Sequence, residues 1–150
     1  MSKSIYLIGS LRNTSVTRLA SRLRAAGHDV FDDWVSAGPE ADDYWQKYVT
    51  ERGQSYDQAL RGYAAQHVFQ YDRKHLNRCD IAILTMPAGK SAHLELGYFI
   101  GLGKPGYICL EKTPERFDVM YAFADKVFQS YDDCVRHFYP KEDTDWSKLP

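Results

Sequence analysis

The chain has 150 residues, and its 19 basic and 20 acidic side chains give a formal net charge of −1. This length predicts a single domain over 1–150, and the near-neutral charge argues against a nucleic-acid polymer or a membrane surface as partner. No apolar run approaches the roughly 20 residues of a membrane-spanning helix. The N-terminus has no signal-peptide pattern, and the three cysteines, Cys79, Cys109 and Cys134, are widely spaced. We therefore expect reduced thiols and a cytoplasmic protein.

The beginning of the chain predicts a parallel β-α-β unit. Residues 4–8 form a short apolar run, and Val16, Leu19 and Leu23 recur at helical spacing after it. A second strand is expected over 28–31. The crossover between two such strands is almost always right-handed, so they should lie parallel in one sheet.

The rest of the chain is expected to continue the alternation of helices and strands. Two helices over 40–52 and 55–78, broken at Gly53, are too long for a minimal crossover, so part of the segment 35–63 is expected to form a lid or an oligomer surface. The later elements are expected as strands over 80–85, 106–110 and 126–129, helices over 91–102 and 131–138, a short helix or turn over 117–123, and a polar tail over about 139–150 that Trp146 anchors. This order predicts an α/β fold, a doubly wound, flavodoxin-like domain with a parallel sheet of about five strands flanked by helices.

Three polar segments are expected at one edge of this sheet. Residues 9–12, 32–34 and 86–91 each follow a predicted strand. Ligands of doubly wound sheets bind beyond the carboxyl ends of the strands. The hydroxyls, glycines, cations and carboxylates of these segments therefore predict a binding site there.

The segment 87–98 contains the most informative turn. Gly89-Lys90-Ser91 is similar to the end of a phosphate-binding P-loop, but Leu84 stands where that loop requires glycine, so a nucleoside triphosphatase is not expected. The turn can still hold one phosphate through backbone N–H groups, Lys90 and Ser91. An ordinary helix cap beside a solvated lysine is the alternative.

Carboxylates remain as the candidates for chemistry. Glu95 is expected in the first turn of its helix, where the helix N-terminus would keep it ionised, and Asp72 should reach the same crevice from the preceding helix. A nucleophilic carboxylate beside a carboxylic acid suits glycosyl transfer with retention. Each residue also has a structural interpretation, Glu95 as a helix-start glutamate and Asp72 as a solvated side chain. No metal site is expected, because His67 and His75 lack a further strong ligand at known spacing.

Four separated motifs carry a family resemblance. They are Ile-Tyr-Leu-Ile-Gly-Ser-Leu-Arg over 5–12, Asp72 eight residues before Asp80, Glu-Leu-Gly-Tyr over 95–98, and Phe-Asp-Val-Met over 117–120. In this order and spacing the chain resembles the nucleoside 2-deoxyribosyltransferase family, including its branch of 2'-deoxynucleoside 5'-phosphate N-hydrolases. The resemblance implies an N-glycosidase or transferase without a cofactor.

The resemblance also implies roles for individual residues. Glu95 would attack C1' of the sugar, Asp72 would give or relay a proton to the departing base, and Tyr6 would hydrogen-bond Glu95. The implied substrate-binding positions are Gly9, Ser10, Arg12, Gly89, Lys90, Ser91 and Asp118. The segment around Asp118 would complete the site of a neighbouring subunit, so a homodimer or higher homo-oligomer is expected.

The chain departs from the family at the sugar 5' end. Gly89 stands where the transferases have an aspartate and the hydrolases a serine, and Asp118 stands where relatives have asparagine or serine. The base, the sugar, the choice of 5'-hydroxyl or 5'-phosphate, and transfer or hydrolysis are left open. Two other functions are also left open, a TIR-like NAD glycohydrolase and a non-catalytic nucleotide-binding sensor.

Overall fold

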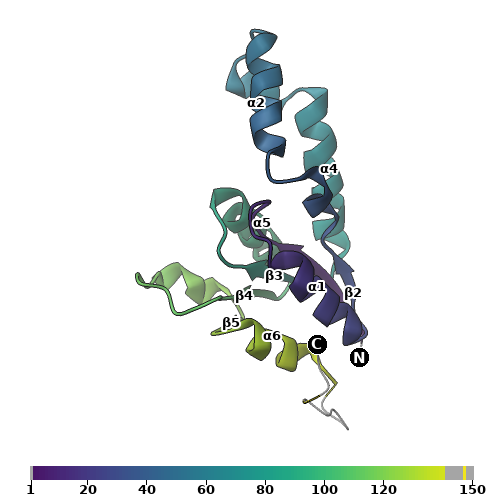
Figure 1. Cartoon of the computed structure of the whole chain (residues 1–150), viewed down its shortest axis with the longest axis vertical. Coiled ribbons are helices and arrows are strands. Elements are labelled where there is room, and N and C mark those ends of the chain that lie inside the picture. The colour runs from purple at the N-terminus through teal and green to yellow at the C-terminus, as the bar shows by residue number, and fades with distance from the viewer. Residues whose placement is uncertain (1, 141–146, 148–150) are drawn as a thin grey trace.

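The computed structural model describes residues 2–140 and 147, and over this part of the chain helices cover both faces of one sheet (Figure 1). Its five strands lie in the order β2-β1-β3-β4-β5, and each neighbouring pair is parallel. The strands are β1 (Ser4–Ile8), β2 (Asp29–Phe31), β3 (Ile81–Thr85), β4 (Gly106–Cys109) and β5 (Lys126–Phe128). This is the flavodoxin-like order, and the predicted fold class is confirmed.

The helices follow the predicted alternation with one important difference. They are α1 (Val16–Ala25), α2 (Ala41–Glu51), α3 (Tyr56–Leu60), α4 (Tyr63–Arg78), α5 (Lys90–Gly101) and α6 (Tyr131–Phe138), with 3₁₀ turns η1 (Asp33–Ala37) and η2 (Val119–Phe123). The single helix predicted over 55–78 is wrong, because Gly62 adopts an extended conformation between α3 and α4. The predicted tail beyond 140, with Trp146, lies outside the described residues.

The two faces of the sheet bury separate cores, and β1 contributes to both. Ile5 and Leu7 pack with side chains of α1 and α6, whereas Tyr6 and Ile8 pack with side chains of α4 and α5. Because successive side chains of a strand point to opposite faces, the position of Tyr6 in β1 commits its ring to the α4–α5 face.

Helix α5 approaches the sheet most closely at Gly106 in β4. A Cβ atom at Gly106 would lie 2.7 Å from Cγ1 of Ile100 and 2.9 Å from Cδ1 of Leu96. Gly97 and Gly101 within α5 are both exposed and make no such contact. The residue that permits the approach is therefore in the strand rather than in the helix.

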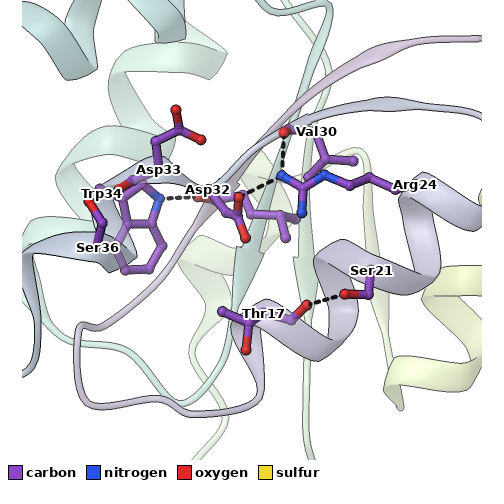
Figure 2. Close-up of polar contacts among 9 residues, drawn as sticks. Thr17, Ser21, Arg24, Val30, Asp32, Asp33, Trp34 and Ser36 are labelled. Carbon is purple, nitrogen blue, oxygen red and sulfur yellow. Dashed lines mark hydrogen bonds and ion pairs between the residues drawn. The ribbon is translucent and has the colours of Figure 1, made fainter.

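The carboxyl ends of β1 and β2 are tied together by side chains (Figure 2). The indole nitrogen of Trp34 donates to the carbonyl of Leu7 at 2.7 Å, and Arg24 pairs with Asp32 at 2.7 Å. A Cβ at Gly9 would lie 3.0 Å from Cγ2 of Val16, so the turn after β1 passes tightly over the start of α1. This edge of the sheet is therefore held by contacts that α1 and the turn after β2 make with the two strand ends.

Helices α2 and α3 and the first part of α4 extend beyond the sheet as an arm (Figure 1). The arm exposes several large apolar side chains, namely Tyr44, Tyr48, Tyr56, Leu60, Tyr63, Val68 and Phe69. No helix in the described ranges is long and apolar enough to cross a bilayer. The role predicted for this segment, a lid or an oligomer surface, stays a prediction.

The contact at Gly106 leads to a stability prediction. Gly106→Ala should lower the free energy of unfolding by about 1–3 kcal/mol, because the new methyl group overlaps α5 and packed cores resist added volume. Urea denaturation measures the change. The matched control is Gly101→Ala, where no atom lies within 4 Å of the added Cβ. An equal loss of stability in both variants would contradict the assigned packing.

Candidate active site

Two helices on one face of the sheet bring Asp72 and Glu95 together over β1. Asp72 lies on α4 and Glu95 on α5, and these helices contact each other. The charge of Asp72 acts on Glu95, and both carboxylates act on the phenol of Tyr6, which is completely buried in β1. The structure therefore gathers the three residues that the sequence predicted as catalytic.

The proximity and burial of the two carboxylates raise their pKa values. Burial raises the pKa of Glu95 to about 7, and the charge of Asp72 adds to this rise while Tyr6 opposes it. Burial raises the pKa of Asp72 to about 6. Two neighbouring carboxyls with raised pKa values titrate as a pair rather than independently.

The predicted environment of Glu95 is wrong in one respect. Helix α5 begins at Lys90, and no acidic residue lies in its first turn. The helix N-terminus acts within about one turn and therefore does not keep Glu95 ionised. Burial beside Asp72 controls this carboxyl instead, and it holds the pKa high.

Tyr6 presents its hydroxyl to this pair. The hydroxyl interacts with Glu95, although no hydrogen bond of normal length and angle reaches it from the described residues. Burial and the neighbouring carboxylates raise the pKa of Tyr6, so it stays a neutral phenol. A neutral phenol that faces a carboxylate is a ready donor, and a small rotation would make it orient Glu95.

Aromatic rings lie beside the carboxylates, and the sequence did not predict them. Phe31 has its ring centroid 4.9 Å from that of Tyr6 and stacks on His75 at 4.0 Å. Tyr71, directly before Asp72, lies 5.8 Å from Phe31 and is partly exposed. No local motif signals this cluster, because its members come from β1, β2 and α4 and meet only in the folded chain.

The loops after β1 and β3 are joined by the side chain of Asn13. Its side-chain amide nitrogen lies 3.4 Å from the carbonyl oxygens of both Thr85 and Pro87. Ser10 accepts from the backbone N–H of Arg12 at 3.1 Å, which tightens the first loop. The predicted binding segments 9–12 and 86–91 thus lie at the same edge of the sheet.

The remaining predicted positions are at the surface. Arg12 lies 3.4 Å from Asp43 of α2, and both side chains are largely exposed. Lys90 and Ser91 begin α5 after Gly89, which has no side chain to cap the helix. Asp118 accepts from the N–H of Met120 at 2.8 Å and so caps η2. The N–H groups at the start of α5 remain available to an anion.

Three surface hollows lie elsewhere on the molecule. One lies between β5 and α6, one beside His28 and Phe138, and one on α2. Within 2–140 and at 147, no group of three or more His, Cys, Asp or Glu side chains is arranged to hold a metal ion. The candidate site is therefore described from its partly buried carboxyls and the buried Tyr6.

The raised pKa of Glu95 predicts how stability depends on pH. Between its ordinary value of 4.5 and about 7, the folded protein binds a proton at Glu95 that the unfolded chain releases. Stability should therefore fall as pH rises through this range, by about 1–3 kcal/mol from this residue. Glu95→Gln should remove that part of the slope in denaturation curves measured from pH 4.5 to 8.

The control for this measurement is Glu51→Gln, which changes an exposed glutamate on α2. It should keep the wild-type slope. The same slope in Glu95→Gln and in the wild type would contradict the assigned environment of Glu95.

No protein-family model and no curated protein sequence matches the chain. Similarity is found to solved structures. A 2-deoxyribosyltransferase of Bacillus psychrosaccharolyticus is 23% identical with a TM-score of 0.60, over 98% of this chain and 96% of that one. The CMP N-glycosidase BcmB of Clostridium botulinum is 12% identical with a TM-score of 0.55, over 90% of this chain and 97% of that one. Sequence identities of 23% and 12% establish a shared fold. The predicted resemblance to the nucleoside 2-deoxyribosyltransferase family is therefore confirmed at the level of the fold.

Proposed function

We propose that the protein cleaves or transfers the N-glycosidic bond of a (2'-deoxy)nucleoside or its 5'-monophosphate. The observation that carries this proposal is the pair of Glu95 and Asp72, two partly buried carboxyls with raised pKa values that lie near the hydroxyl of Tyr6. The fold adds support, because two enzymes that share it are a 2-deoxyribosyltransferase and a CMP N-glycosidase.

In the first step, the ionised Glu95 attacks C1' of the sugar. The C1'–N bond breaks as the new C1'–O bond forms, and its electron pair leaves with the base. Asp72 gives its proton to the base, directly or through water, so that a neutral base departs. The raised pKa of Asp72 suits its role as the acid, and the step proceeds from the state in which Glu95 is ionised and Asp72 holds the proton.

In the second step, the glycosyl-glutamate is released. Water gives hydrolysis and a second base gives transfer, and in either case the incoming group attacks C1' and frees Glu95. Asp72, now ionised, takes the proton that the incoming group loses. Two displacements at C1' retain its configuration.

The sugar 5' end is proposed to lie at the start of α5. Gly89, Lys90 and Ser91 offer free backbone N–H groups, one cation and one hydroxyl. Gly9, Ser10 and Arg12 approach from the loop after β1, which Asn13 holds against the loop after β3. A hydroxyl or a phosphate group would find donors in this arrangement.

The two other functions differ in their products. A TIR-like NAD glycohydrolase would release nicotinamide from NAD, and a nucleotide-binding sensor would bind without turnover. The deciding experiment incubates the protein with deoxynucleosides, their 5'-monophosphates and NAD, and detects free base by liquid chromatography. Release of base from a nucleoside or monophosphate supports the proposal. Release of nicotinamide alone, or binding without products, would contradict it.

Loss of the nucleophile should abolish most turnover. Glu95→Gln keeps the size of the side chain but removes its charge, so turnover should fall by about a thousandfold or more. The thermal unfolding midpoint shows whether the variant is folded. Glu51→Gln, as the control, should retain wild-type turnover, and appreciable activity in folded Glu95→Gln would refute the covalent mechanism.

Asp72 should matter most for poor leaving groups. A natural base needs a proton to depart, whereas a nitrophenolate does not, so Asp72→Asn should slow the natural nucleoside by about a hundredfold more than a nitrophenyl glycoside. The measurement is kcat/KM for both substrates in both proteins. Equal losses for the two substrates would indicate a structural role for Asp72.

We also propose that the active form is a homodimer or a larger homo-oligomer that shares its sites. The segment around η2 exposes large apolar side chains, with Phe117 85%, Val119 76% and Phe123 71% accessible. Such a concentration of exposed apolar surface marks a contact site. Asp118 lies within this segment, which suits the role of completing a neighbouring copy's site.

Mixing two inactive variants tests shared sites. Glu95→Gln lacks the nucleophile and Asp118→Ala lacks the group proposed to enter the neighbour's site, so a hybrid contains one site that is intact. Activity should reappear after the two proteins are mixed and allowed to exchange subunits. Full activity of the wild type at concentrations where sedimentation shows only monomer would rule the arrangement out.

A further inference from the structure

His93, two residues before Glu95, makes two hydrogen bonds that define its state. Its Nδ1 lies 2.7 Å from the carbonyl oxygen of Gly89, and its Nε2 lies 2.9 Å from the hydroxyl of Tyr121. A carbonyl oxygen can only accept, so Nδ1 carries the proton. In the neutral ring Nε2 is then an acceptor, and Tyr121 donates to it.

Tyr121 is the inward-facing side chain of a segment that is otherwise exposed. Phe117, Val119, Met120 and Phe123 all face outward, whereas Tyr121 packs against the core beneath α5. The Tyr121 and His93 rings also stack, with centroids 5.8 Å apart. The Tyr121 hydroxyl further reaches the sulfur of Met86 at 3.8 Å.

The hydrogen bond between His93 and Tyr121 helps to set the position of Asp118. The N–H of Tyr121 donates to the carbonyl of Asp118, and the N–H of Met120 donates to the Asp118 carboxylate, so Asp118 is hydrogen-bonded into the η2 turn. The imidazole of His93 joins this turn to Gly89, which is the N-cap of α5. The His93 side chain thus connects the two segments proposed to contact the 5' end of a substrate, the turn at the start of α5 and the η2 segment.

We propose that His93 and Tyr121 are a positioning pair that sets how far η2 carries Asp118 from α5, and thereby which 5' group the site accepts. The inference rests on the proposed function, in which Asp118 approaches the 5' end of the substrate in a neighbouring copy. The pair then connects the α5 turn, which contacts the 5' end of the substrate in its own subunit, to Asp118, which contacts the 5' end of the substrate in the neighbouring copy. Neither side chain takes part in the bond changes at C1'.

The anchoring is tested first without any substrate. Hydrogen exchange measured by mass spectrometry on the intact protein should show faster exchange over 118–124 in Tyr121→Phe, by about three- to tenfold, the loss expected for one hydrogen bond. His93→Asn retains a donor near Gly89 but does not reach Tyr121, so it should behave like Tyr121→Phe. His93→Gln places an amide near the former Nε2 and should preserve much of the protection.

The control is Tyr98→Phe, which removes a hydroxyl from the same helix. Tyr98 donates to Asn77 at 2.6 Å, so its loss should leave exchange over 118–124 unchanged. Wild-type exchange in Tyr121→Phe would overturn the positioning pair. This measurement stands whether or not the wild-type protein turns over a nucleoside, so it separates failure of the pair from failure of the proposed function.

Steady-state kinetics test the consequence for specificity. Tyr121→Phe and His93→Asn should raise KM for a 2'-deoxynucleoside by about three- to tenfold while kcat changes little. For the matching 2',5'-dideoxynucleoside, which has no 5' oxygen, KM should stay at the wild-type value. Equal changes for both substrates, or a fall in kcat alone, would overturn the assignment to the 5' end.

Discussion

The burial of two carboxyls against each other is the constraint on which the rest of this structure depends. An ionised carboxylate loses favourable hydration when it leaves water, and a second one nearby adds repulsion. Glu95 and Asp72 meet both conditions on the α4–α5 face, and their pKa values are raised accordingly. Such a pair costs stability, and it is the arrangement that the proposed function would use.

The sheet supports this costly pair through a small number of close contacts. Gly106 allows α5 to lie directly on β4, and Tyr6 fills the space between β1 and the two helices without ionising. The rigid core therefore determines the position of Glu95 relative to Asp72. The loops that would bind the sugar are held differently, through Asn13, Trp34 and Tyr121, by hydrogen bonds across the carboxyl edge.

Two segments with exposed apolar side chains lie outside the body that the sheet and its covering helices form. The arm of α2, α3 and the start of α4 extends from one side, and η2 presents its aromatic and aliphatic side chains to solvent. Arg12 pairs with Asp43 in the arm, and Tyr121 of η2 makes hydrogen bonds to His93 and to the sulfur of Met86. In the proposed function, the catalytic carboxyls therefore lie in the body of the fold, and substrate recognition involves segments whose positions depend on a few polar contacts.

The sequence by itself determined the fold class and the catalytic candidates. Alternating apolar runs and amphipathic helices specify a doubly wound sheet because each pattern has its own period, and the positions of Tyr6, Asp72 and Glu95 followed from motifs in fixed order. Only the tertiary structure decided the state of Glu95, which local reasoning had assigned to a helix N-terminus. Burial and the charge of a residue from another helix control that carboxyl, and neither can be read from neighbours in the chain. Three other features also appeared only in the folded protein, because each joins residues from different elements. They are the Phe31 cluster, the close contact of Gly106 with α5, and the hydrogen bond between His93 and Tyr121.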